Sequence, residues 1–140
     1  MRVLFDNDVV LDLVLDREPF VEAAAALFDM HERGRIDGYI SGITLINVFY
    51  VTRKSKGMDV ARQAVAELLT TLDVCFLDKS IMEAARVLAL ADYEDAVQHA
   101  SATASGLDAI VTRNLDDYKN ATLPVFAPTD SLKHLKAQTS

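Results

Sequence analysis

Acidic side chains gather at three places in this sequence, each beside the end of a predicted strand or helix. Asp6 and Asp8 follow the apolar run RVLF (2–5). The other acidic residues lie in ADYEDAVQ (91–98) and RNLDDY (113–118): Asp92, Glu94, Asp95, Asp116 and Asp117. Carboxylates held a few ångströms apart repel one another, and a hard divalent cation relieves that repulsion. If the fold unites the three groups, we expect Mg²⁺ or Mn²⁺, which keeps several waters and can activate one for phosphodiester hydrolysis.

Each acidic group also has an explanation that needs no ligand. Carboxylates in the first turn of a helix, such as Glu94 and Asp95, are stabilised by free N–H groups and by the helix dipole. Asp116 and Asp117 fit a solvated turn. Asp6 is harder to explain in this way, because an ionised carboxylate directly after a buried strand needs a partner. The site prediction therefore depends most on Asp6.

Short β-prone runs alternate with longer helical patterns along the chain, and these elements must position the acidic groups. The predicted strands cover residues 2–5, 37–41, 73–77, 109–112 and 123–127. The predicted helices cover residues 9–16, 20–34, 43–57 (capped by Ser41 or Thr44), 58–72, 80–90 and 95–106, followed by a short helix capped by Thr129 or Asp130. This alternation predicts one domain, residues 1–140, of the α/β class. We expect a three-layer α/β/α sandwich with a mostly parallel central sheet.

A parallel sheet brings the carboxyl ends of its strands to one edge, where open α/β folds place their ligand sites. Asp6 follows the first predicted strand, and Thr112 ends the fourth. The acidic segment 91–98 starts the helix before that fourth strand. The topology therefore predicts that the three acidic groups face a common edge of the sheet.

The composition excludes several classes of protein. With 140 residues, 51% of them hydrophobic, the chain can bury a sizeable core. It contains no apolar run long enough to span a membrane, and its acidic start does not resemble a signal peptide. The single cysteine, Cys75, favours a reduced, cytoplasmic setting, and no Cys/His spacing indicates zinc. The net charge of −7 argues against a general electrostatic attraction to nucleic acid.

Four segments, in this order, resemble the PIN-domain family, including the VapC-like toxins of bacterial toxin–antitoxin pairs. They are LFDNDVVLDLVLDREP (4–19), SGITLINVFYVTRK (41–54), DYEDAVQHASA (92–102) and IVTRNLDDY (110–118). Each segment alone is a weak signal, but their order and spacing are specific, and the match spans nearly the whole chain. The resemblance implies a PIN-like fold and a metal-dependent ribonuclease that cuts RNA with a cluster of carboxylates.

The resemblance also implies roles for individual residues. Asp6 matches the first metal-binding aspartate, and Asp95 matches the central aspartate that opens a helix. Asp117, which precedes Tyr118, matches a further acidic position, for which Asp116 competes. Further candidates flank these positions: Asp92, Glu94, Asn114, and Thr112, which could orient a metal-bound water or a phosphate.

Two positions depart from the family pattern. Asp8 stands where relatives carry a neutral Asn, and Asn47 stands where they usually carry a metal-binding Glu. Asn can ligate a cation through its carbonyl oxygen but adds no charge, so the substitution weakens the expected cation site. A subgroup of PIN-like proteins that resembles this chain also carries Asn at this position.

Two other functions compete with a ribonuclease. FDNDVV also resembles the Asp-x-Asp opening of haloacid-dehalogenase-type phosphatases, in which Asp6 would be the nucleophile and Asp8 the acid or base. Against this, the chain is short and lacks a Lys followed by a late Gly-Asp pair. The third hypothesis is a PIN-like protein-binding domain that is catalytically weak or inactive because position 47 has lost its carboxylate.

Partners and secondary features follow from the remaining patterns. The resemblance to the PIN-domain family implies an RNA substrate and a cognate antitoxin; a homodimer is also expected, and no membrane is. The Ala-rich helix 20–33 could serve a partner or the core. The basic run Arg53, Lys54 and Lys56 suits either a helix C-terminus or a local phosphate-binding patch. His99 shares a helix face with Asp95, but a packing or surface role is the simpler interpretation.

Overall fold

The computed structural model describes residues 1–139, which form a five-stranded sheet with seven α-helices and one 3-10 helix. The strands are β1 (Arg2–Phe5), β2 (Asp37–Ile40), β3 (Asp73–Val74), β4 (Ala109–Val111) and β5 (Val125–Phe126). The helices are α1 (Asn7–Val14), α2 (Val21–Glu32), α3 (Gly42–Lys56), α4 (Met58–Thr71), α5 (Lys79–Arg86), α6 (Tyr93–Ala104), η1 (Leu115–Tyr118) and α7 (Pro128–Thr139). The strand order is β3-β2-β1-β4-β5, and every pair is parallel.

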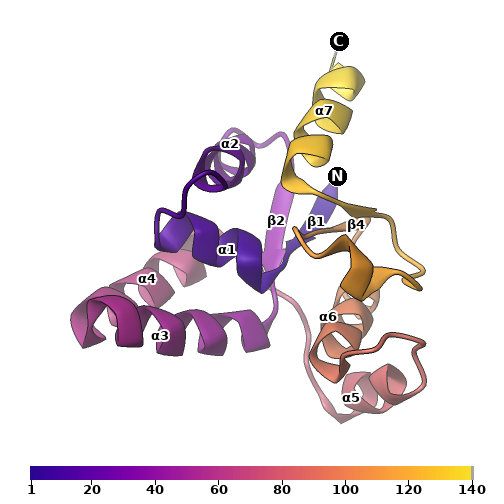
Figure 1. The fold of residues 1–140 in the computed structure, drawn as a ribbon. Coiled ribbons are helices and arrows are strands. Elements are labelled where there is room, and N and C mark those ends of the chain that lie inside the picture. Colours follow the sequence, from indigo (N-terminus) through magenta and orange to yellow (C-terminus); the bar gives the residue numbers. More distant parts are fainter. Residues whose placement is uncertain (140) are drawn as a thin grey trace.

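Side-chain alternation along β1 divides the core between the two faces of the sheet. Val3 and Phe5 pack with residues of α1, α2, α3 and α4, whereas Leu4 packs with Ala102 of α6 and with Tyr118. Because successive strand residues point to opposite faces, this split creates two helical layers around one sheet. Figure 1 shows α1 to α4 on one side and α5 and α6 on the other. The three-layer α/β/α prediction is confirmed, with a sheet that is wholly parallel.

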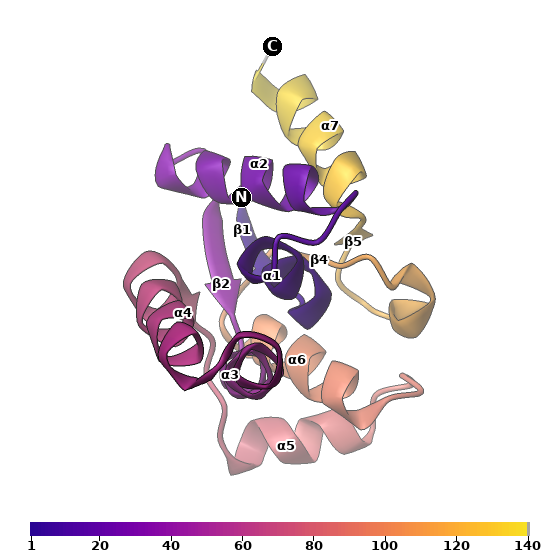
Figure 2. The same cartoon turned by 60° about the vertical axis from the view of Figure 1, so that its left-hand side comes forward.

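The C-terminal helix closes the first layer rather than standing apart. α7 packs against α2, which it crosses at an angle in Figure 2, and Leu135 is buried in the same core cluster as Leu27 and Phe28. The prediction of a cap at Thr129 or Asp130 is wrong by two or three residues. The helix already begins at Pro128, so both residues lie in its first turn. Proline suits the first helical position because its missing N–H has no helical partner there.

Several element boundaries differ from the predicted ones because capping decides them. The first helix begins at Asn7, two residues earlier than predicted, since the Asp6 carboxylate accepts the Asn7 N–H. Ser41 caps α3 by accepting the Thr44 N–H. The helix predicted to start at Asp95 starts at Tyr93, with Asp92 as its cap. The turn that carries Asp116 and Asp117 forms the 3-10 helix η1, which the sequence pattern did not indicate.

Some predicted elements are shorter in the structure. The strands predicted at 73–77 and 123–127 contain two ladder residues each, because both lie at the edges of the sheet. The helix predicted at 80–90 ends at Arg86. Among residues 1–139, no helix is long and apolar enough to cross a membrane.

Candidate active site

Asp6 lies directly after β1 and is the most strongly held acidic side chain at this edge of the sheet. It is 5% exposed. Its Oδ1 accepts the Asn7 backbone N–H and the Gln98 side-chain amide, both at 2.7 Å, and its Oδ2 accepts the Thr112 hydroxyl at 2.8 Å. These donors stabilise the ionised carboxylate in its buried position. The partner that a buried carboxylate requires is therefore a set of hydrogen-bond donors from α1, α6 and the end of β4.

Asp8 points to the same place from the first turn of α1. Its Oδ2 accepts the Arg113 backbone N–H at 3.0 Å and lies 3.3 Å from the Thr112 hydroxyl oxygen, whose proton is donated to Asp6. Its Oδ1 is buried and has no hydrogen-bond partner among the described residues. Burial, together with the charge of Asp6, raises the pKa of Asp8 to about 6. A buried acceptor without a donor, beside a second carboxylate, is an environment that a bound cation or a proton would stabilise.

Asp95 approaches this pair from the first turn of α6. Its backbone N–H donates to the Asp92 carboxylate at 3.1 Å, and its Oδ1 accepts the Tyr118 hydroxyl at 3.3 Å. Burial, followed by the charges of Asp6, Asp92 and Asp117 in that order, raises the pKa of Asp95 to about 7. The three acidic segments thus lie within electrostatic reach of one another, although they are separated by up to 111 positions in the sequence (residues 6 to 117).

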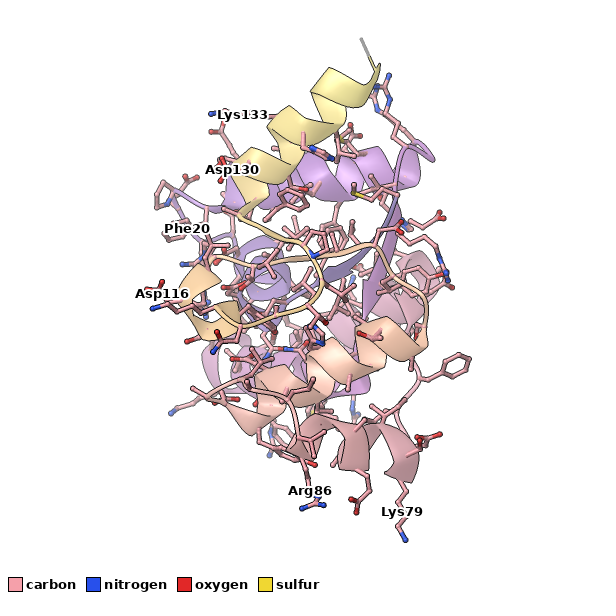
Figure 3. All side chains as sticks on the ribbon, turned by 90° about the vertical axis from the view of Figure 1, so that its right-hand side faces the viewer. Phe20, Lys79, Arg86, Asp116, Asp130 and Lys133 are labelled. Carbon is pink, nitrogen blue, oxygen red and sulfur yellow. The ribbon has the colours of Figure 1, made fainter. Side chains whose placement is uncertain are left out.

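The residues that follow β4 differ in how closely they approach the acidic edge. Thr112 is fully buried, and its hydroxyl accepts the Asn114 N–H at 3.0 Å while it donates to Asp6. The Asn114 side chain is exposed. Asp117 is also exposed but acts on the pKa of Asp95, whereas Asp116 projects from the outer edge of the molecule in Figure 3. Of the two competing aspartates, Asp117 is the one whose charge reaches Asp95.

A second polar cluster surrounds Glu94, beside Asp95 on α6. Glu94 Oε1 accepts the side-chain amides of Asn7 at 2.6 Å and Asn47 at 2.8 Å. The Thr44 hydroxyl donates to Asn7 Oδ1 at 2.5 Å, which fixes the direction of that amide. Asn47 therefore lies against a carboxylate even though it carries no charge itself.

Three side chains organise this edge, and sequence reasoning missed two of them, Gln98 and Asp12. Gln98 is completely buried, donates to Asp6, and accepts the Ser41 hydroxyl through Oε1, which also lies 3.1 Å from the Thr44 hydroxyl oxygen. The available signal was a polar residue within the small-residue segment 96–102, one turn after Asp95. Asp12 is 1% exposed and binds the Arg113 guanidinium through two hydrogen bonds of 2.7 and 3.1 Å. The third is Asn7, whose contacts have no local signal in the sequence because its amide binds residues more than 35 positions away.

His99 and the basic run do not join the acidic cluster. The His99 Nε2 accepts the backbone N–H groups of Thr122 and Leu123 at 3.1 and 3.3 Å, and the side chain is buried. The packing interpretation of His99 is confirmed, and burial lowers its pKa. Arg53, Lys54 and Lys56 are exposed in the last turn of α3. A helix rises about 1.5 Å per residue, so that turn lies about 14 Å or more along α3 from Thr44.

The donor set at the acidic edge suits a hard cation, although it is not a closed cage. Among residues 1–139, no three Asp, Glu, His or Cys side chains form a ready-made metal-binding group. Mg²⁺ usually takes only one or two carboxylates and keeps several waters. Asp8 Oδ1 is an unpartnered carboxylate oxygen, and Asp95 makes one long hydrogen bond at 3.3 Å. The oxygen chemistry and these free acceptors fit Mg²⁺ or Mn²⁺ with most of its water shell retained.

Comparisons with known proteins agree with this geometry. The sequence matches the family model of the PIN domain over residues 2–116, which is most of the chain. No curated protein matches it significantly. DNA-bound VapBC from Salmonella typhimurium superposes with a TM-score of 0.71 at 18% identity, covering 91% of this chain and 98% of that chain. A toxin–antitoxin complex from Klebsiella pneumoniae superposes with a TM-score of 0.67 at 25% identity, covering 90% and 97%.

A third structure carries a description of its activity. VapC20 from Mycobacterium tuberculosis, described as a sarcin–ricin loop cleaving toxin, superposes with a TM-score of 0.62 at 15% identity. The match covers 77% of this chain and 86% of that chain. With its parallel sheet, its acidic carboxyl edge and this family match, the chain belongs to the PIN-domain family. The resemblance inferred from four sequence segments is confirmed.

Proposed function

We propose that this chain is a Mg²⁺- or Mn²⁺-dependent endoribonuclease and the toxin component of a toxin–antitoxin pair. The observation that carries the proposal is the meeting of Asp6, Asp8 and Asp95 at the carboxyl edge of the sheet in a PIN domain. The similar structures include VapBC and other toxin–antitoxin complexes and one RNA-loop-cleaving toxin, which supports the same activity class.

Asp6 and Asp95, with Asp117 beside them, are the residues that we assign to hold the cation. When bound, the cation supplies a polarised water and charge stabilisation at the scissile phosphodiester. Gln98 and Thr112 hold the Asp6 carboxylate in place through one hydrogen bond each. Asp8 has one unpartnered oxygen and a pKa of about 6, so it is suited to hold or release a proton near neutral pH.

Glu94 supplies the carboxylate that the family pattern places at position 47. Asn47 and Asn7 both donate to Glu94 Oε1, so two amides orient it while its second oxygen makes no contact to either. The negative charge that the family pattern places on α3 is thus supplied from α6 in this chain. This arrangement supports an active enzyme over a domain that is inactive because position 47 is neutral.

The phosphatase alternative is disfavoured by the contacts of Asp6. An aspartyl nucleophile must present one carboxylate oxygen to a phosphorus atom. Both oxygens of Asp6 accept hydrogen bonds, and the side chain is 5% exposed. The PIN-domain family match, which the phosphatase alternative does not explain, favours cation binding over covalent attack at Asp6.

An antitoxin, a second copy of the chain and a cytoplasmic location complete the proposal. The similar VapBC structures support an antitoxin partner. A homodimer is supported by large apolar side chains that stand exposed on α3, Ile46 at 60% and Tyr50 at 59%. The cytoplasm is the compartment where an RNA target and an antitoxin would both be present, and the single Cys75 suits its reducing conditions.

RNA cleavage by the purified chain tests the proposed activity. We expect single-stranded RNA to be cut with Mg²⁺ or Mn²⁺ and to remain intact with EDTA. Asp6→Asn should lower the rate at least about 100-fold, because it removes a charge assigned to the cation. Asp37→Asn, at the opposite end of the strands, is the matched control and should retain full activity. Equal activity of wild type and Asp6→Asn would refute catalysis at this site.

A further inference from the structure

A cavity of about 330 Å³ opens beside the acidic edge, between the start of α2, the segment after β4 and the start of α7. Its lining residues include Pro19, Phe20, Ala23, Arg113, Pro128 and Thr129. The volume lies at the small end of the range for ligand sites, about 300–1,000 Å³. Apart from Arg113 and Thr129, the lining side chains are apolar, and Phe20 supplies the one aromatic ring.

Arg113 forms the polar wall of this cavity, but its charge is already paired. Its Nε and Nη2 donate to the two carboxylate oxygens of Asp12, and its guanidinium carbon lies 3.8 Å from the centre of the Phe20 ring. Asp12 thus occupies one of the two bidentate edges of the guanidinium and balances its charge, which lowers its attraction for a phosphate. A flat, charge-balanced stack of guanidinium and ring remains, which suits the face of an aromatic ligand better than an anion.

The same residue connects the cavity to the proposed cation site. The Arg113 backbone N–H donates to Asp8, and the preceding Thr112 donates to Asp6. A ligand against the Arg113 side chain therefore lies one side-chain length from the acidic cluster. Figure 3 shows Phe20 and Asp116 of η1 projecting from the same edge of the molecule, with Lys79 and Arg86 at another end.

We propose that this cavity binds one nucleobase of the RNA strand, next to the phosphodiester held at the acidic edge. The inference rests on the proposed ribonuclease function and adds how the substrate is gripped. A chain of net charge −7 gains little from general attraction to phosphates, so stacking must contribute more of the binding. Single-stranded RNA is commonly held by bases stacked on aromatic rings and on arginine planes.

Neutral nucleosides in the presence of EDTA test base binding in this cavity separately from cation and phosphate binding at the acidic edge. The chain contains no tryptophan, so Phe20→Trp introduces a single fluorescent reporter into the cavity wall, and Phe76→Trp introduces one at an exposed position after β3, at the opposite sheet edge. We expect adenosine or uridine to quench the fluorescence of the Phe20→Trp variant in a saturable manner. Ribose and inorganic phosphate should not, and the Phe76→Trp variant should show only linear quenching.

The second measurement is the affinity of the wild-type chain and of Phe20→Ala for the same nucleosides, determined by NMR titration. Stacking is worth enough per base that Phe20→Ala should weaken nucleoside binding about 5- to 100-fold, whereas Phe76→Ala should leave it unchanged. Absence of saturable nucleoside binding, equal binding of phosphate, or binding insensitive to Phe20→Ala would each overturn the proposal. Because no metal is present, metal-dependent RNA cleavage can succeed or fail independently of this result. Loss of antitoxin binding with unchanged nucleoside binding in Phe20→Ala would assign the cavity to a protein partner instead.

Discussion

At the scale of single residues, Asp95 illustrates how the fold changes an ordinary side chain. Burial and the charges of Asp6, Asp92 and Asp117 raise its pKa to about 7, against an ordinary value of 3.8. Between about pH 4 and pH 7 the native state therefore holds a proton that the unfolded chain has released. It follows that this group makes the protein less stable as pH rises through that window.

The first prediction uses Asp95→Asn, which removes this titration. In EDTA, we expect the Tm of Asp95→Asn to exceed that of wild type by more at pH 8 than at pH 5, because only the wild type must ionise a crowded carboxylate. Thermal unfolding across this range gives the measurement, and Mn²⁺ should narrow the gap at pH 8 by stabilising the wild type. A difference that does not change with pH would show that Asp95 ionises normally.

The second prediction concerns the buried carboxylate of Asp12. Arg113 binds it through two hydrogen bonds, and Arg17 lies farther away at 3.9 Å. Arg113→Ala leaves a buried charge with one distant partner, so we expect a loss of about 3 kcal/mol in the free energy of unfolding. Chemical denaturation measures it. The matched control is Arg86→Ala, which breaks an exposed pair with Glu83 and should cost less than about 1 kcal/mol. Similar losses in the two variants would contradict this account.

At the scale of elements, the sheet is packed so closely that β2 requires a glycine. A Cβ atom on Gly38 would lie 2.6 Å from Phe5 Cε2 and 3.0 Å from Leu72 Cδ2. Phe5 cannot move away easily, because it is fully buried and stacked on Phe28 with ring centres 5.0 Å apart. This contact holds the end of β1, and therefore Asp6, in its position.

The third prediction follows from that contact. Gly38→Ala should lower the free energy of unfolding by about 1–3 kcal/mol through overpacking. Gly42→Ala is the matched control, since nothing lies within 4 Å of its added Cβ and the residue begins α3. Urea denaturation of both variants distinguishes them. A Gly38→Ala variant as stable as wild type would mean that the core is looser than the contacts indicate.

The junction of α1, α3 and α6 at Glu94 gives the fourth prediction. If Glu94 supplies the displaced carboxylate, Glu94→Gln should weaken Mn²⁺ binding about 10-fold or more in calorimetry. Glu83→Gln, an exposed change on α5, should leave the affinity unchanged. Unchanged Mn²⁺ affinity in Glu94→Gln would mean that no carboxylate compensates for the neutral Asn47, and it would favour a catalytically weak enzyme.

The sequence predicted the elements well where periodicity and capping residues agree, and less well where contacts distant in the chain decide. Strand β1 was predicted from its apolar run, and the parallel sheet was predicted from the alternation of strand and helix patterns. The common acidic edge was then predicted from that topology. Neither the bond from Gln98 to Asp6 nor the pairing of Asp12 with Arg113 has a local signal, because each joins residues about 90 or more positions apart. The 3-10 helix η1 was missed because its acidic residues read equally well as a solvated turn.

At the scale of the whole molecule, the proposed function requires an acidic chain with an acidic site to bind a polyanion. A cation at the carboxyl edge of the sheet and a stacking cavity beside it, both proposed above, would supply the attraction that the net charge does not. Both lie where β1 and β4 end, so one small region of a parallel sheet would supply the phosphate chemistry and the grip on a base. The net charge of −7 then favours substrates that are held locally rather than along a long groove.

The most direct test is the anomalous scattering of Mn²⁺ in crystals of the full chain. We predict one strong peak from a Mn²⁺ ion that is bonded to the carboxylates of Asp6 and Asp95 at about 2.0–2.3 Å, with waters completing the coordination. The peak should be absent from Asp6→Asn crystals treated identically. No peak at this edge, at a Mn²⁺ concentration that supports RNA cleavage, would contradict the central claim that these carboxylates hold the catalytic cation.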